Sequence, residues 1–214
     1  MSFEKQRLRM VESQIVARGI KDPRVIDAMK RVPRHLFTDE ALRTRAYDDS
    51  PLPIGEKQTI SQPYMVAVMS EALELTGTEA VLEVGTGSAY QTAVLSCLAR
   101  QVFSIERLGI FVDRARKILE SLDIKNVTLK TGDGSRGWRT KAPFDAILVT
   151  AGSPRVPQPL VEQLVPGGRL VIPVGDRANQ ALLRLRKSAD GGTTTEELVG
   201  CRFVDLQGAF GWPD

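Results

Sequence analysis

The sequence predicts an α/β protein with a doubly wound sheet of seven strands and a helical N-terminal extension. From residue 80 onwards, short apolar segments alternate with segments of helical periodicity, which is typical of doubly wound folds. The apolar segments are nearly continuous, as in Ala146-Ile-Leu-Val149, which indicates parallel strands covered on both faces. A glycine turn, Gly85-Thr-Gly87, directly follows the first of these segments, where such sheets bind ligands.

The N-terminal extension is expected to be helical. Apolar residues recur at helical spacing within residues 3–18. Asp22-Pro23 is an N-cap followed by proline at the first helical position, so a second helix is expected to begin here and to run through Met29.

The next segment is rich in proline. Residues 33–58 are expected to be mostly irregular around a short helix near residues 38–44, and a long loop of this kind is usually functional. A third helix is expected over residues 61–75.

The remaining elements follow in alternation. Strands are expected at residues 80–84, 101–106, 126–130, 144–150, 168–174, 180–187 and 197–206. Helices are expected near residues 88–99, 109–122 and 157–164. A loop signal at Asp190-Gly-Gly separates the last two strands, so we expect them to form an antiparallel pair.

Length and composition narrow the functional classes. The 214 residues suit one structural domain, in which residues 1–76 pack on an α/β core of residues 77–214. No apolar run is long enough for a membrane span and the N-terminus lacks a signal-peptide pattern, so a cytoplasmic protein without a membrane partner is expected. The net charge of +3 comes from scattered basic residues, which argues against nucleic-acid binding. One histidine and two distant cysteines predict no metal site.

The segment around Gly85 predicts a nucleoside site. Val81-Leu-Glu-Val leads into Gly85-Thr-Gly87-Ser-Ala-Tyr90, and the second strand ends at Glu106. An acid about 20 residues beyond the first glycine lies where a carboxylate can bind a ribose diol. A dinucleotide site would have a third glycine where this chain has Tyr90, which disfavours a dehydrogenase.

The residue two places before the glycines distinguishes the nucleoside. With Glu83, the pattern E-x-G-x-G resembles motif I of the S-adenosylmethionine methyltransferases, which implies that Glu83 lies near the methionine end of the cofactor and that Glu106 accepts from the ribose hydroxyls. Asp133, in Thr131-Gly-Asp-Gly134, can accept from the adenine amino group, although the same residues can form a plain turn. The chain lacks (D/N)-P-P-(Y/F) after the fourth strand, which counts against N-methylation of nucleic acid.

The segment before motif I identifies a narrower resemblance. Leu52-Pro-Ile-Gly55 and Gln58-Thr-Ile-Ser-Gln-Pro-Tyr-Met65 closely resemble the protein-L-isoaspartate (D-aspartate) O-methyltransferases, as do Val32-Pro-Arg and Arg202-Phe-Val. The resemblance covers essentially the whole chain. It implies a Rossmann-like S-adenosylmethionine-dependent methyltransferase fold with N-terminal helices and a swapped order of the last two strands.

The resemblance also implies a reaction. A monomeric enzyme would methylate the α-carboxylate of L-isoaspartyl residues in damaged proteins and peptides, and the ester would close to a succinimide that partly yields normal aspartate. A carboxylate is already ionised at neutral pH, so no strong base is required. Ser61 corresponds to the active-site serine of the family, although it can also be the N-cap of the helix that contains Pro63. A different carboxylate acceptor and a non-catalytic cofactor-binding protein are the alternatives.

The motifs and the resemblance together predict a set of cofactor-binding residues. They are Gln58, Thr59, Glu83, Gly85, Thr86, Gly87, Ser88, Tyr90, Gln91, Glu106, Asp133 and Gly134. Four residues depart from the family pattern: Lys57 and Ala89, where glycine is common, and Asp205 and Gln207, where proline and valine are common. The peptide site is expected to differ most because residues near this C-terminal end help to shape it in the family.

Overall fold

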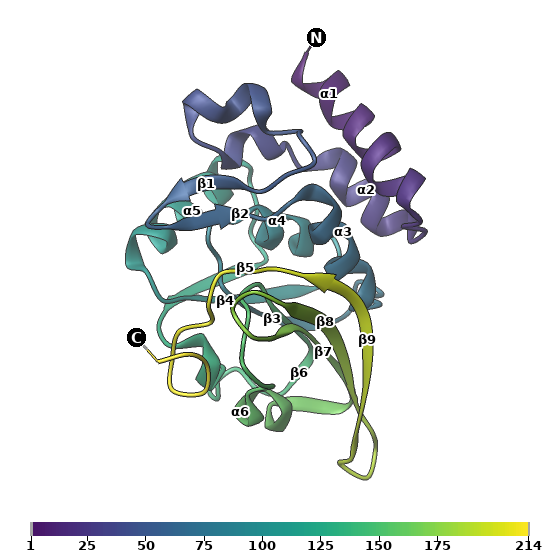
Figure 1. Ribbon diagram of the computed structural model, residues 1–214, viewed down its shortest axis with the longest axis vertical. Coiled ribbons are helices and arrows are strands. Elements are labelled where there is room, and N and C mark those ends of the chain that lie inside the picture. Colours follow the sequence, from purple (N-terminus) through teal and green to yellow (C-terminus); the bar gives the residue numbers. More distant parts are fainter. Residues whose placement is uncertain (1, 214) are drawn as a thin grey trace.

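The computed structural model describes residues 2–213 and has a twisted main sheet with helices on both faces (Figure 1). The α-helices are α1 (Phe3–Met10), α2 (Pro23–Arg31), α3 (Pro63–Ala72), α4 (Tyr90–Ser96), α5 (Gly109–Ser121) and α6 (Gln158–Glu162). The strands are β1 (Leu52–Gly55), β2 (Gln58–Ile60), β3 (Ala80–Val84), β4 (Gln101–Glu106), β5 (Val127–Thr131), β6 (Phe144–Val149), β7 (Leu164–Gly175), β8 (Gln180–Lys187) and β9 (Thr193–Cys201).

The main sheet has the predicted architecture. Its seven strands lie in the order β5-β4-β3-β6-β7-β8-β9. The pairs from β5 to β7 are parallel, whereas β7 with β8 and β8 with β9 are antiparallel. The α/β class and the antiparallel final pair are therefore confirmed. Because β3 lies between β4 and β6, the chain reverses its winding direction at β3, and ligands of doubly wound sheets bind at such a point.

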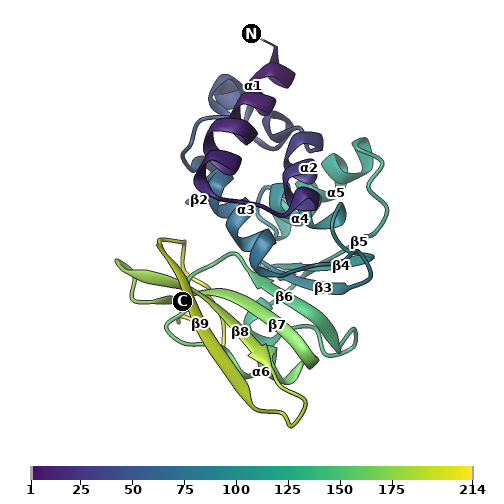
Figure 2. The same cartoon turned by 90° about the vertical axis from the view of Figure 1, so that its right-hand side faces the viewer.

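Each face of the sheet has its own hydrophobic core. Alternate residues of β3 serve the two faces, since Val81 packs under the helical group of α3, α4 and α5, and Leu82 packs toward α6. Both side chains are fully buried, which stabilises the fold by about 1.5–3 kcal/mol for each side chain of this size. Figure 2 shows α1, α2 and α3 on the side of the sheet opposite α6.

The N-terminal extension joins the larger core. Met29 of α2 and Leu95 of α4 belong to the same cluster of buried residues. The helix expected over residues 3–18 forms, but it changes from α1 to a π-helical turn at Val11–Ile15 and then to a 3-10 turn at Val16–Arg18. The division at residues 76 and 77 stays a prediction. Among the described helices, none has the length and apolarity that a membrane span requires.

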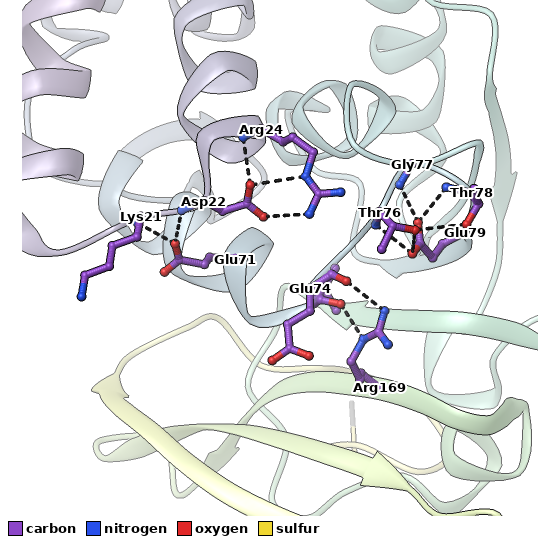
Figure 3. Close-up of polar contacts among 11 residues, drawn as sticks. Lys21, Asp22, Arg24, Glu71, Glu74, Thr76, Gly77, Thr78, Glu79 and Arg169 are labelled. Carbon is purple, nitrogen blue, oxygen red and sulfur yellow. Dashed lines mark hydrogen bonds and ion pairs between the residues drawn. The ribbon is translucent and has the colours of Figure 1, made fainter.

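Polar contacts fix the C-terminal end of α3 (Figure 3). Arg169 of β7 donates from Nε to the Leu73 carbonyl oxygen at the C-terminal end of the helix, across 2.6 Å. Glu71 accepts from the backbone N–H of Asp22 across 2.7 Å, which joins α3 to the start of α2. These contacts connect the sheet, the C-terminal end of α3 and the start of α2.

The expectation of an irregular chain at residues 33–58 is wrong for its last part. β1 and β2 form an antiparallel hairpin in which Leu52 pairs with Ile60. Its loop residues Glu56 and Lys57 have φ of +49° and +57°. Two-residue hairpin loops favour positive φ at both positions, which glycine adopts most easily. The hairpin was missed because neither loop residue is a glycine or an asparagine, and because Pro53 lies in β1.

The expectation of a strand over residues 197–206 is also wrong at both ends. β9 begins at Thr193 and ends at Cys201. Beyond it, the Gln180 side chain accepts from the Phe203 backbone N–H across 2.8 Å and donates to its carbonyl oxygen, so a side chain replaces the ladder bonds. The chain then crosses to the end of β6, where the Gly152 N–H donates to the Val204 carbonyl oxygen across 2.7 Å.

Candidate active site

The loop after β3 has a backbone that requires glycine. Gly85 has a φ of +97°, and a Cβ atom there would lie 2.3 Å from the Thr150 Oγ1 atom. Thr150 donates from Oγ1 to the Gly85 carbonyl oxygen across 2.6 Å, so the loop is tied to the end of β6. Gly87 has a φ of +49°. The two glycines thus leave the carboxyl end of β3 open on the ligand side.

Glu106 holds this loop from the end of β4. One carboxylate oxygen accepts from the Gly87 N–H and the other accepts from the Leu108 N–H, each across 2.9 Å. An ionised carboxylate has about four acceptor positions, so two remain for hydroxyl groups of a ligand. Glu106 is 9% exposed and lines the cavity described below, as a ribose-binding acid would.

Glu83 lies beneath the loop rather than in it. Its side chain is fully buried and accepts from the Thr92 and Ser104 hydroxyls, each across 2.6 Å. Burial raises the pKa of Glu83 to about 8, against the effect of these two hydrogen bonds, and the nearby Glu106 charge raises it further. Glu83 is therefore mainly protonated at neutral pH. Its second oxygen has no hydrogen-bond partner within residues 2–213.

A cavity opens at the carboxyl ends of β3, β4 and β6. Its empty volume, including the open mouth, is about 840 Å³. Ten of the thirteen predicted site residues line it: Gln58, Thr59, Ser61, Gly85, Thr86, Gly87, Ser88, Gln91, Glu106 and Gly134. A Cβ atom at Gly134 would lie 2.4 Å from Val84 Cγ1, so glycine is needed for the wall to close here.

Three predicted residues do not line this cavity. Besides Glu83, Tyr90 is buried on the other side of α4, where the Arg34 guanidinium carbon lies 4.9 Å from its ring centroid. Asp133 lies next to the cavity, and its carboxylate already accepts from the backbone N–H groups of Ser135 and Ala209, each across 3.0 Å. Asp133 therefore acts as a cap for the chain around it, which is the turn interpretation of its motif.

Sequence reasoning missed part of the cavity wall. The further lining residues are Val84, Ile105, Arg107, Leu108, Thr150, Ala151, Val204, Asp205, Leu206 and Gln207. Six of them lie in the last two residues of β3 or β4 or within two residues after β4 or β6, and position at a strand end is a usable signal in a doubly wound sheet. Residues 204–207 carry no such signal, because they reach the cavity only after the chain leaves β9.

Ser61 lies where this cavity meets a second one, the acceptor groove. The groove is lined by Pro51, Thr59, Ser61, Gln62, Met65, Thr150, Gly200, Cys201, Arg202, Phe203 and Val204. Four of these residues, Thr59, Ser61, Thr150 and Val204, line both cavities. The N-cap interpretation of Ser61 is wrong, because α3 has Gln62 as its N-cap.

Comparison with known proteins identifies the family. The profile of the protein-L-isoaspartate(D-aspartate) O-methyltransferase family matches residues 5–210. The chain belongs to this family. A protein-L-isoaspartate O-methyltransferase of Trichlorobacter lovleyi is 59% identical over 212 residues, which cover 99% of this chain and 98% of that protein. A second relative, protein-L-isoaspartate O-methyltransferase 2 of Geotalea uraniireducens, is 61% identical over 206 residues, 96% of this chain and 95% of that protein.

Solved structures have the same fold over nearly the whole chain. A protein-L-isoaspartate O-methyltransferase with 28% identity superposes with a TM-score of 0.85 and covers 97% of this chain and 67% of its own. A Plasmodium falciparum structure, described as an enzyme of this kind in complex with S-adenosyl-L-homocysteine, has a TM-score of 0.80 at 24% identity and covers 94% of this chain and 98% of its own. The Rossmann-like methyltransferase fold predicted from the sequence is therefore confirmed.

Proposed function

We propose that this family member is a protein repair enzyme that methylates the α-carboxylate of L-isoaspartyl residues in damaged proteins and peptides. The observation that carries the proposal is the position of Ser61, which lines both the cofactor cavity and the acceptor groove. The methyl ester formed would close to a succinimide, whose hydrolysis partly yields normal aspartyl residues.

The cofactor is S-adenosylmethionine, and the cavity fits it. When bound, it supplies an electrophilic methyl group on a sulfonium centre. Glu106 has free acceptor positions for the ribose hydroxyls, and the positive φ values of Gly85 and Gly87 remove side chains from the loop that faces the ligand. Gln58 and Thr59 would lie near its methionine end. Glu83 is covered by the loop, so we assign it the role of supporting the loop from below.

Ser61 is suited to orient the acceptor. Its half-buried hydroxyl makes no hydrogen bond with another residue of the described chain, so it is free to donate to an acceptor carboxylate. That carboxylate is ionised at neutral pH and needs no base. The contribution of the chain is then to hold the reacting groups in line and to exclude water, which can lower the barrier by about 7–11 kcal/mol at best.

The direct test uses two synthetic peptides that differ only in one isoaspartyl or aspartyl residue, with radiolabelled S-adenosylmethionine as donor. Label that enters only the isoaspartyl peptide, as a base-labile ester, is the expected result. Equal labelling of both peptides, or label only on small-molecule carboxylates, would contradict the repair function.

We propose further that the enzyme acts as a monomer in the cytoplasm and does not use nucleic acid. Both cavities are lined by residues of one chain, and the net charge is only +3, which support this proposal. Sedimentation at catalytic concentration is expected to give the mass of one chain, with or without added RNA. A stable dimer, or a complex with RNA, would oppose it.

A further inference from the structure

The acceptor groove has a single charged side chain among the described residues that line it, Arg202. The remaining lining is apolar, hydroxylic or amide, apart from the thiol of Cys201. Burial raises the pKa of that thiol to about 11, so it carries no charge at neutral pH. Arg202 is thus the one positively charged side chain among the described residues that line the groove.

The charge of Arg202 is not compensated within residues 2–213. The side chain is exposed and makes no hydrogen bond or ion pair with them. Three acids on neighbouring segments have other cations: Asp205 pairs with Arg177 across 2.8 Å, Asp49 with Arg18 across 2.9 Å, and Asp48 with Arg45 across 3.3 Å. Arg202 therefore remains available to an anion that enters the groove.

The position of Arg202 separates it from the site of methyl transfer. It lines the acceptor groove and not the cofactor cavity, whereas Ser61 lines both. An acceptor carboxylate beside Ser61 would place the neighbouring residues of the peptide along the rest of the groove, where Arg202 lies.

The backbone on the C-terminal side of Arg202 is anchored. The Gln180 side chain bonds both backbone polar groups of Phe203, and the Val204 carbonyl oxygen accepts from Gly152. The backbone therefore loses little further freedom when the Arg202 guanidinium binds a carboxylate, and the planar donors of the guanidinium match both carboxylate oxygens.

We propose that Arg202 is a specificity-determining residue that favours isoaspartyl substrates with an acidic residue within two positions of the damaged one. This inference rests on the proposed function. Two segments bring the required groups together: the chain before α3 presents Ser61, and the chain after β9 presents Arg202.

The test compares three isoaspartyl peptides, with Glu two positions before the isoaspartyl residue, Glu two positions after it, or Gln at both places. We expect kcat/KM of the native enzyme to be about fivefold higher for one or both Glu peptides, as for a partly desolvated ion pair, and to lose this ratio in high salt. Arg202→Gln is expected to reduce the ratio to about one, and Arg202→Lys to retain part of it. Arg31→Gln removes the same charge from an exposed site on α2 and is expected to keep the full ratio.

Two outcomes would overturn the inference. Equal kcat/KM for all three peptides with the native enzyme would show that the enzyme has no preference for acidic neighbours, while the repair function would still stand. An unchanged ratio in Arg202→Gln would show that a residue other than Arg202 causes the preference. No label on any isoaspartyl peptide with the native enzyme would instead overturn the proposed function, and this inference with it. Because the ratio is taken within each variant, a general loss of stability does not imitate the expected result.

Discussion

The Gly87 backbone N–H donates a hydrogen bond to the Glu106 carboxylate across 2.9 Å, so the acid that faces the cavity also holds the glycine loop. Gly87 follows β3, whereas Glu106 ends β4. The second carboxylate oxygen of Glu106 accepts from the Leu108 backbone N–H. One side chain thus both lines the cavity and fixes the loop geometry.

Glu106→Gln is expected to weaken the binding of S-adenosylhomocysteine by about 10- to 100-fold, because the amide has one acceptor oxygen instead of two and carries no charge. Isothermal titration calorimetry measures the change. Glu120→Gln, on the exposed side of α5, is the matched control and is expected to bind normally. Normal affinity in Glu106→Gln would exclude Glu106 from the cofactor site.

Ser61→Ala is expected to lower kcat/KM for an isoaspartyl peptide by about 10- to 100-fold, the cost of one hydrogen bond to a charged group. The affinity for S-adenosylhomocysteine is expected to change little, since Ser61 lies at the junction of the two cavities rather than deep in the cofactor cavity. Ser13→Ala, at an exposed position near the end of the N-terminal helix, serves as the control. A Ser61→Ala enzyme with full activity would show that the hydroxyl does not orient the acceptor.

Ala89→Gly is expected to stabilise the protein by about 0.5–1 kcal/mol. Ala89 has a φ of +67°, a conformation that costs an L-residue about 1–2 kcal/mol, while glycine adds about 0.4–1 kcal/mol of backbone entropy to unfolding. Urea unfolding measures the difference. The control is Ala93→Gly, within α4. It is expected to destabilise the protein by about 1 kcal/mol, which is the ordinary cost of glycine inside a helix. Destabilisation by Ala89→Gly would show that the backbone of Ala89 is not strained.

The stability of the protein is expected to fall as the pH rises toward 8. Because burial raises the folded-state pKa of Glu83 to about 8, from an ordinary value of 4.5, the folded protein keeps a proton that the unfolded chain releases. The stabilisation is complete below pH 4.5, decreases by up to about 1.4 kcal/mol per pH unit above it, and is lost near pH 8.

Glu83→Gln tests this coupling, because the amide imitates the protonated acid. Its urea midpoint is expected to match that of the native protein at pH 5 and to exceed it at pH 8. The control Glu120→Gln should leave the difference between the two pH values unchanged. Equal midpoints for Glu83→Gln and the native protein at pH 8 would mean that Glu83 is ionised in the folded state.

The elements that sequence reasoning placed well depend on neighbours in the chain. The periodicity of residues 109–122 and the apolar run at residues 144–150 each predicted an element to within one residue, since the pattern of one helix or strand is contained in its own sequence. The hairpin loop at Glu56 and Lys57 lacked the usual turn residues and was missed.

The residues of the candidate site also divide into those that a local sequence pattern predicts and those that depend on distant segments. Gly85, Gly87 and Glu106 were predicted from one strand-turn-helix-strand unit, and the structure brings them together in one cavity. Tyr90 belongs to the same unit, but it is buried away from the cavity, where Arg34, more than fifty residues earlier, packs against its ring. Spacing along the chain carries no information on such a contact.

The sequence by itself determined the family, the doubly wound sheet, and the glycine loop with Glu106, because each follows from a pattern of residue types along a continuous stretch of the chain. Only the tertiary structure decided that Ser61 joins two cavities, that Glu83 is buried beneath the loop, and that residues 204–207 form a wall of the cofactor cavity. The physical reason is that burial and cavity lining arise from the packing of segments far apart in the chain, as where Gln180 redirects the chain at Phe203.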